Sequence, residues 1–282
     1  MLINSNLILN KALKEGYAIP AYNINNLEWT RFILEACNED KSPVILGITP
    51  KTVQYFGGYK LVVSLVRNMI EELKITIPVV LHLDHASTFD ECKSAIDTGF
   101  TSVMIDVSDK VLEENTRITS EVCSYAKQKN VSVEAELGDF GSDDTKANNY
   151  LFAKLDECKN FVIDTSIDSL AACIGNRHGI YDGSVTLDFN LLGAICKEVK
   201  MPLVLHGASG LDENKIKTAI FCGVAKVNIN TDLQIAWANA LRKYLDFDKT
   251  VYDPRRIIKS GEKDLKRIIH EKNNILGCKN KI

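Results

Sequence analysis

Short apolar runs alternate with longer amphipathic stretches along almost the whole chain. Most of the runs are continuous rather than strictly alternating, which is typical of parallel strands covered on both faces. The segments between them repeat apolar residues at three- and four-residue spacing, as amphipathic helices do. The runs predict eight strands, over residues 17–25, 42–49, 78–85, 102–108, 132–138, 169–175, 202–209 and 226–231.

The intervening segments carry the usual signals of helix ends. Residues 88–99 and 212–223 each finish on a glycine, a common helix terminator. Asp188 and Asp212 are expected N-caps, because their side chains can accept from the first free backbone amides. Further helices are predicted over residues 27–40, 60–74, 231–241 and 253–277.

Eight repeats of strand and helix predict an α/β fold, a (β/α)8 TIM barrel with an extra C-terminal helical segment. The chain has 282 residues and no evident linker, so we expect one domain over residues 1–282. A doubly wound sheet is the alternative, but no G-x-G-x-x-G follows the first strand. The polar stretch 139–150 interrupts the rhythm, and predicts either a functional lid or a solvated loop.

Composition and charge exclude several classes of protein. No stretch approaches the roughly 18 apolar residues of a membrane span, and asparagines interrupt the N-terminus where a signal peptide would be apolar. Eight cysteines without a C-x-x-C pair predict free thiols in a reducing compartment. The basic tail, 249–282, is interpreted as a solvated helix face. We therefore expect a cytoplasmic protein with no membrane or nucleic-acid partner.

Histidines gather at the predicted carboxyl ends of the strands, where a barrel carries its active site. Of the five in the chain, four lie there: His82, His85, His178 and His206. Three imidazoles on three converging strand ends are the pattern of a catalytic zinc site, so His85, His178 and His206 are predicted ligands. His82 is interpreted as a structural or supporting residue, since alternation turns it away from His85.

Glycines and a helix N-terminus predict an anion site beside these histidines. Gly179 and Gly207 let backbone amides approach an anion closely, and residues 228–231 lead into a helix. The common phosphate site of barrels is built from the loops after strands seven and eight. Singly, each residue fits a tight turn or an N-cap as well. Together with a metal they indicate Lewis-acid chemistry on a phosphorylated carbonyl compound.

The motifs resemble one family along roughly residues 1–277, the class II fructose-bisphosphate and tagatose-bisphosphate aldolases. The matching segments are YAIPAYNINNLEWT, HLDH, SVMID, SVEAELG, the HG of 178–179, LHGASG, NINT and YDPR. The resemblance implies reversible cleavage of a phosphorylated ketose through a zinc-stabilised enediolate. Fructose 1,6-bisphosphate, cleaved to dihydroxyacetone phosphate and glyceraldehyde 3-phosphate, is the expected substrate.

The resemblance also implies roles for individual residues. Asp84 matches the catalytic aspartate, and Asp144 is the nearest counterpart of a loop glutamate that moves a carbon-bound proton. Asp106 and Glu136 match an alternative buried metal position, and a monovalent cation is a further implied cofactor. Arg255 matches an arginine that binds the distal phosphate, often across the interface of a homodimer or homotetramer. The matched substrate-binding positions are Gly179, Gly207, Ala208, Ser209, Asn228, Asn230, Thr231 and Arg255.

Some positions depart from the family pattern. The polar loop reads Gly141-Ser142-Asp143-Asp144, so its carboxylate is one methylene shorter than the expected glutamate. Asp182 stands where fructose-bisphosphate members often have a lysine. The sequence therefore leaves tagatose 1,6-bisphosphate and 6-phospho-5-dehydro-2-deoxygluconate open as alternative substrates.

Residues of the chain also bear on three alternative functions. A Schiff-base aldolase needs a buried lysine on a strand, whereas Lys226 is expected at the start of strand eight, at the wrong end. A metal-dependent hydrolase would carry H-x-H after strand one, which instead ends Asn23-Ile24-Asn25. A non-catalytic sugar-phosphate-binding protein is the third, and the retention of Asp84 with all three histidines argues against it.

Overall fold

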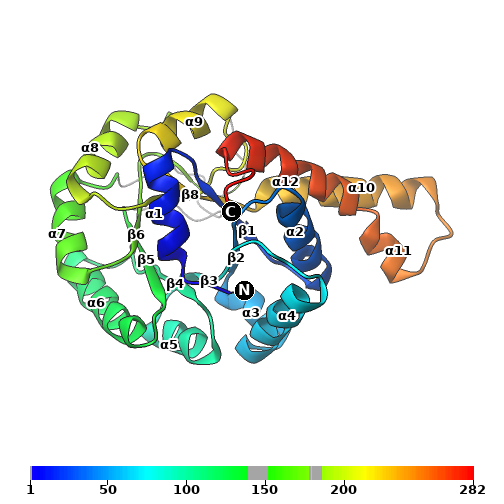
Figure 1. Cartoon of the computed structure of the whole chain (residues 1–282), viewed down its shortest axis with the longest axis horizontal. Helices are drawn as coiled ribbons and strands as arrows, with labels where there is room; N and C mark the ends of the chain where they lie inside the picture. Colours follow the sequence, from blue (N-terminus) through cyan, green and yellow to red (C-terminus); the bar gives the residue numbers. More distant parts are fainter. Residues whose placement is uncertain (1, 139–151, 178, 180–185) are drawn as a thin grey trace.

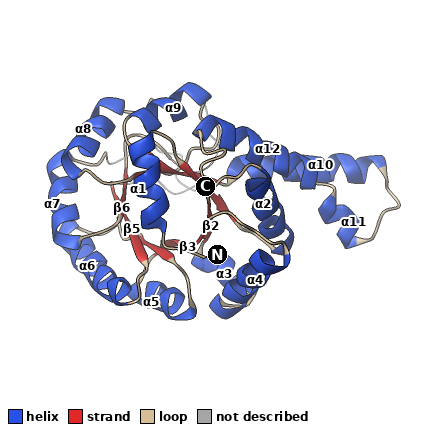
Figure 2. Ribbon diagram, in the orientation of Figure 1, coloured by secondary structure: helices blue, strands red, loops and turns tan. Residues whose placement is uncertain are grey.

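The computed structural model describes residues 2–138, 152–177, 179 and 186–282. Eight parallel strands pair in chain order and close into a barrel, with helices around it (Figures 1 and 2). The predicted TIM barrel is confirmed, and each strand lies within or beside its predicted run. The strands are β1 (Ile19–Asn23), β2 (Val44–Ile48), β3 (Val79–Ala86), β4 (Ser102–Ile105), β5 (Ser132–Leu137), β6 (Ser169–Ala172), β7 (Leu203–Leu205) and β8 (Val224–Ile229).

The helices follow the strands and begin where the sequence supplies caps. Asp188 and Asp212 accept from the amides of Leu191 and Lys215, so both predicted N-caps are confirmed. The helices are α1 (Ser5–Glu15), α2 (Leu27–Glu39), α3 (Pro50–Phe56), α4 (Tyr59–Glu72), α5 (Phe89–Thr98), α6 (Leu112–Gln128), α7 (Leu155–Thr165), α8 (Phe189–Val199), α9 (Glu213–Phe221), α10 (Thr231–Phe247), α11 (Pro254–Lys259) and α12 (Glu262–Leu276).

Helix α1 covers the end of the barrel where the strands begin (Figure 1). Its Ser5 hydroxyl lies 2.7 Å from that of Ser132, the first residue of β5. Asn6 donates to Asp168, just before β6, over 2.7 Å. Helix α1 therefore closes the amino ends of the strands. The candidate site residues lie at the opposite, carboxyl ends.

The C-terminal segment is helical, as predicted, but it is divided. Helices α10 and α11 project from the barrel as an arm, and α12 returns to pack beside α2 (Figure 1). The break falls at Gly261, where a Cβ would lie only 2.0 Å from the ring of Trp237. Any larger residue there would push the indole away, so the turn depends on glycine.

The strands are almost wholly buried between the barrel interior and the helical shell. Apolar side chains from both faces form one large core and a small separate cluster of Ala171, Cys173 and Val204, which explains why the sequence shows unbroken apolar runs. Among the residues that the structure describes, no helix is long and apolar enough to cross a bilayer.

Candidate active site

The carboxyl end of β3 presents two adjacent residues, Asp84 and His85, at the mouth of the barrel. Neighbours in a regular strand point to opposite faces. Here the pairing with β4 gains one residue between Leu83 and Ala86, and His85 takes a left-handed backbone with φ of 52°. This conformation is uncommon for a residue with a side chain and costs free energy. The bulge allows both groups to serve one site.

Asp84 is buried and is held by two amide groups from other strands. Asn23 at the end of β1 donates to one carboxylate oxygen over 3.0 Å, and Asn228 on β8 donates to the other over 3.2 Å. Burial alone would raise the pKa of Asp84, but the nearby positive charges of His85 and Lys226 lower it below its ordinary range. Asp84 is therefore an ionised, oriented carboxylate, and Asn23 is a site residue that the sequence analysis did not single out.

His206 follows β7 and is tied to the loop after β6. Its carbonyl accepts from the Asn176 amide over 2.9 Å. The next residue, Gly207, has a φ of 64°, and a Cβ on it would lie 1.9 Å from the Arg177 carbonyl oxygen. Glycine is thus required for the two loops to approach. The predicted ligand His178 itself lies outside the described residues.

The imidazoles of His85 and His206 meet at the barrel mouth, with ring centroids 4.7 Å apart. Ligand atoms of Asp84, His85 and His206 all lie within 4.8 Å of one another. Burial alone would lower the pKa of His85, but the Asp84 and Asp106 carboxylates raise it to about 9. The two imidazoles are suitable zinc donors, and the Asp84 carboxylate lies beside them.

A second group of donors also includes His85. Asp106 accepts from His85 Nδ1 over 2.7 Å, and ligand atoms of His85, Asp106 and Glu136 form a set of three that also lie within 4.8 Å of one another. Ser108 lies 2.8 Å from Asp106 and 3.0 Å from Glu136. The other Glu136 oxygen is buried without a hydrogen-bond partner among the described residues.

Electrostatics favour a cation at this second group. Burial and the neighbouring Asp106 carboxylate raise the pKa of Glu136 well above its ordinary value. A bound cation would offset both the burial and the repulsion. The residues predicted for a buried metal position, Asp106 and Glu136, are therefore brought together with His85.

The predicted anion site is assembled from the loop after β7 and the start of α10. The amide of Asp232, in the first turn of α10, lies 3.4 Å from the Ser209 hydroxyl, and Asp232 in turn accepts from the Gly210 amide. Asn230 precedes the helix, and its own side chain makes no capping hydrogen bond to the first turn. Helix N-termini of this kind attract anions. Ala208 is fully buried, whereas Asn230 and Thr231 are half-buried.

One predicted residue, Arg255, stands apart from this cluster. Arg255 lies on α11 in the projecting arm, 89% exposed, and its guanidinium pairs with Asp253 (Figure 1). Gly179 is described, with a φ of 84°. The loop carboxylate Asp144 and the substituted position Asp182 lie outside the described residues.

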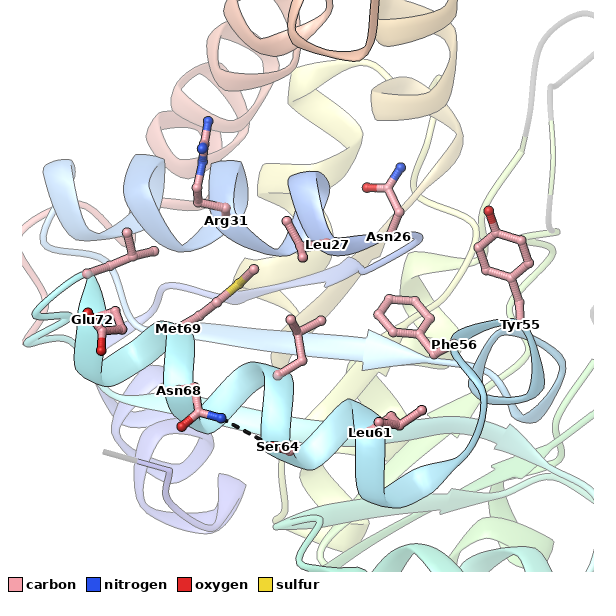
Figure 3. Close-up of a pocket in the computed structure, with 12 residues that line it drawn as sticks. Asn26, Leu27, Arg31, Tyr55, Phe56, Leu61, Ser64, Asn68, Met69 and Glu72 are labelled. Atoms are coloured by element: carbon pink, nitrogen blue, oxygen red, sulfur yellow. Dashed lines mark hydrogen bonds between the residues drawn. The ribbon is translucent and has the colours of Figure 1, made fainter. Parts of the chain in front are cut away.

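A large apolar groove on the outside of the barrel is not this site. It has a volume of about 580 Å³ and runs between α2 and the α3–α4 pair, lined by Leu27, Phe56, Leu61 and Met69 among others (Figure 3). The labelled side chains include no group of metal-binding histidines or carboxylates. Its chemistry suits packing rather than catalysis.

Lys226 differs from its expected position. It is the third residue of β8, not the first, and its side chain is 1% exposed in the barrel interior. Its ammonium lies 2.6 Å from Glu134 and 3.2 Å from His82 Nε2. The strand starts earlier than predicted because Val224 already pairs with β7. Held in this ion pair, Lys226 does not offer the free buried amine of a Schiff-base aldolase.

Comparison with known proteins decides the family. The family described as class-II fructose-bisphosphate aldolase matches residues 3–281. The chain belongs to the class-II fructose-bisphosphate aldolase family. It is 46% identical to the fructose-bisphosphate aldolase of Geobacillus stearothermophilus over 282 residues, covering 99% of this chain and 98% of that protein.

Solved structures of aldolases share the fold over the whole chain. The YdjI aldolase from Escherichia coli K12 aligns with a TM-score of 0.87 and 32% identity, covering 100% of this chain and 99% of that one. The fructose-bisphosphate aldolase from Campylobacter jejuni aligns with a TM-score of 0.83 and 26% identity, over 100% and 97%. The resemblance expected from the motifs is confirmed, and this family member is a class II aldolase, an enzyme whose family generally depends on zinc.

Proposed function

We propose that this aldolase cleaves fructose 1,6-bisphosphate reversibly to dihydroxyacetone phosphate and glyceraldehyde 3-phosphate. The observation that carries the proposal is Asp84, an oriented carboxylate beside the imidazoles of His85 and His206. The names of the similar proteins favour fructose 1,6-bisphosphate over tagatose 1,6-bisphosphate and 6-phospho-5-dehydro-2-deoxygluconate.

His85 and His206 would hold the catalytic zinc, with His178 as the third ligand. When bound, zinc supplies a Lewis acid that withdraws charge from the carbonyl oxygen of the substrate. Asp106 and Glu136 would offer a second, buried position through the shared ligand His85, as their contacts allow. A monovalent cation, implied by the family resemblance, would be a further cofactor.

Asp84 would move the hydroxyl proton. Its carboxylate accepts that proton during cleavage and returns it to the aldehyde oxygen during condensation. Asn23 and Asn228 each hold one oxygen, so the carboxylate does not need to reorient between the two directions. A base that is ionised and fixed before the substrate arrives costs no further ordering.

The loop after β7 and the start of α10 would bind the phosphate of the triose half. Gly207 and Ser209 contribute close backbone and hydroxyl groups, and α10 contributes its N-terminal amides. Thr231 stands in the first position of that helix. The remaining positions proposed for this end of the substrate are Gly179, Ala208, Asn228 and Asn230.

Arg255 would act from a second copy of the chain. It stands on the arm outside the barrel, and the arm also exposes Phe247 and Tyr252 at 90% and 91%. Large exposed apolar side chains on a projecting element are typical of an interface. We therefore propose a homodimer or homotetramer of single-domain chains, residues 1–282, in which the arm reaches a neighbour.

The chain's eight cysteines are all free thiols, six of them buried, which supports a cytoplasmic location. The proposed partners are thus small phosphorylated ketoses and other copies of the same chain. We propose no nucleic-acid or membrane partner.

The test is to strip the purified protein with a chelator, reload it with zinc, and assay all three candidate ketose phosphates. We expect activity to depend on reloading and kcat/KM to be highest for fructose 1,6-bisphosphate. His178→Ala and His206→Ala should each lose bound zinc in elemental analysis. Zinc content and activity unchanged in both variants would contradict the ligand assignment, and a higher kcat/KM for another ketose would correct the substrate.

A further inference from the structure

A layer of buried polar side chains lies inside the barrel directly beneath the proposed zinc site. Lys226, Glu134, His82 and Ser102 are each 1–3% exposed, and they come from β8, β5, β3 and β4. Contacts between strands that are not neighbours, such as β8 with β5, run through the barrel interior. The reaction outlined above gives none of the four a task.

We propose that Lys226 and Glu134 form a relay that positions His206 to bind the catalytic metal. The inference rests on the proposed function in one respect, the assignment of His206 as a ligand. Lys226 is a positioning residue in this arrangement, because it touches neither substrate nor metal and acts through Glu134.

The first link joins Glu134 to His206. Glu134 Oε1 lies 2.9 Å from His206 Nε2, and both side chains are buried. A carboxylate only accepts, so Nε2 carries the hydrogen of the neutral imidazole. Nδ1 is then the nitrogen with a lone pair for a metal. Carboxylates that accept from the far nitrogen of a metal-binding histidine fix both its tautomer and its ring orientation.

The second link joins Glu134 to Lys226. The other carboxylate oxygen accepts from the Lys226 ammonium over 2.6 Å. Glu134 is therefore held at both oxygens and cannot rotate without losing one contact. A buried carboxylate without a partner is costly, so the ammonium is what keeps this acceptor in place below His206.

The third link fixes the ammonium itself. Lys226 also lies 3.2 Å from His82 Nε2, and His82 Nδ1 lies 2.8 Å from the Ser102 hydroxyl. Since the ammonium can only donate, His82 Nε2 is the acceptor and Nδ1 carries the hydrogen toward Ser102. Lys226, Glu134, His82 and Ser102 all stand on strands rather than loops, which gives the relay the rigidity that a metal site needs.

A double-mutant cycle on zinc binding tests the relay. The variants are Lys226→Met, Glu134→Gln and the double variant, and the zinc Kd is measured by chelator competition. We expect each single variant to weaken zinc about 10-fold, within the roughly 10–100-fold range for lost supporting groups. Lys226→Met frees Glu134, whereas Glu134→Gln turns an amide N–H toward the ammonium.

The double variant distinguishes a relay from two separate structural effects. In the double variant, the oxygen of the amide introduced at position 134 can still accept from His206, and no ammonium repels the amide N–H groups. The loss of zinc affinity should therefore not exceed that of either single variant. Independent roles would instead multiply to about 100-fold. The visible spectrum of the Co²⁺-loaded proteins reports ligand geometry without reference to activity, and should change in the single variants. Thermal unfolding of the metal-free proteins checks that each variant folds.

Ser132→Ala is the matched control. It removes a buried hydrogen bond to Ser5 from the same strand as Glu134 but leaves Lys226, Glu134 and His206 in contact, so the zinc Kd should stay within about 3-fold of the original. Unchanged zinc binding and Co²⁺ spectra in both single variants, with a loss in His206→Ala, would overturn the relay alone. Unchanged zinc binding in His206→Ala would overturn the ligand assignment, and the relay with it.

Discussion

Asp84 is the residue proposed to move the hydroxyl proton, and its surroundings predict that its loss would affect catalysis but not metal binding. Both carboxylate oxygens are already held by amides of Asn23 and Asn228. We expect Asp84→Ala to retain zinc on its histidine ligands and to lose aldol cleavage by about 10²–10⁴-fold, the usual contribution of a positioned acid or base. Steady-state kinetics with elemental analysis checks this, and near-normal turnover would assign the proton transfer elsewhere.

A second carboxylate is expected to act on the carbon-bound proton of the triose phosphate. Asp144 lies in the polar loop after β5, outside the described residues, and is shorter than the glutamate implied by the family. We predict that Asp144→Ala slows exchange of that proton with solvent while zinc content stays unchanged. A carboxylate would be a sufficient base, because a zinc ion held by the proposed ligands would withdraw charge from the adjacent carbonyl.

Asp143→Ala is the control for this prediction, since it removes a carboxylate from the same loop. It should slow the exchange less than Asp144→Ala does. Equal exchange rates in the original protein and both variants would mean that the loop does not carry the base.

Residue identity at the site was readable from the sequence, but residue geometry was not. The histidines and Asp84 stand out because few polar residues interrupt the apolar runs. The left-handed backbone of His85 leaves no trace in the letters HLDH. Glu134 and Glu136 share one face of β5, and the sequence does not show that they contact different partners. Glu136 meets Asp106, and Glu134 meets Lys226, because strand stagger sets their depth in the barrel.

At the scale of elements, the apolar runs predicted the strands well because parallel strands are covered on both faces. The exception is the start of β8, where Lys226 breaks the run and hides the pairing of Val224 with β7. The predicted C-terminal helix is likewise divided by a contact with Trp237 that only the folded chain brings about. Local pattern therefore gave the elements, and long-range contacts set their ends.

The return of α12 onto α2 depends on Asp40, which lies at the C-terminus of α2 with its side chain 10% exposed. Asp40 accepts from Asn273 and His270 on α12, each over 2.9 Å, and pairs with Lys279 over 3.0 Å. Burial alone would raise the pKa of Asp40, but these three hydrogen bonds outweigh it and lower the pKa below its ordinary value. The charged carboxylate thus stabilises the docking of α12.

We predict that Asp40→Asn lowers the free energy of unfolding by about 1–2 kcal/mol at pH 7, from the loss of charge-assisted hydrogen bonds. Because the folded pKa is depressed, the stabilisation is present above the unfolded value, near 4, and is lost as the pH falls through the folded value. The difference in unfolding midpoint from the original protein should therefore shrink below about pH 4.

Glu121→Gln provides the comparison, because the ion pair of Glu121 with Arg117 is more than half exposed on both sides. Exposed pairs of this kind contribute little, so its unfolding midpoint should match that of the original protein. A pH-independent deficit in Asp40→Asn would show that the number of hydrogen-bond acceptors, and not the charge, matters.

For the whole molecule, the arm is the feature that a single copy leaves unexplained. Figure 1 shows α10 and α11 extending beyond the helical shell, and α11 carries Arg255. From that position, an arginine could bind a substrate phosphate only in the active site of a neighbouring copy. In the proposed assembly, Arg255 completes the active site of a partner chain and not that of its own chain. Activity measurements on mixed oligomers can distinguish these two cases.

Subunit complementation tests this directly. Arg255→Ala and Asp84→Ala chains, each defective alone, are co-expressed with different tags and the mixed oligomer is isolated. If Arg255 serves the neighbour, the Arg255→Ala chain keeps Asp84 and receives Arg255 from its partner, so one site in two is intact and about half of the original activity returns. If Arg255 serves its own chain, every site lacks one residue and activity stays low. Mixing Arg255→Ala with the Asp84→Ala/Arg255→Ala double variant removes Arg255 from both chains and should restore nothing. A fully active monomer in sedimentation at assay concentration would contradict the assembly altogether.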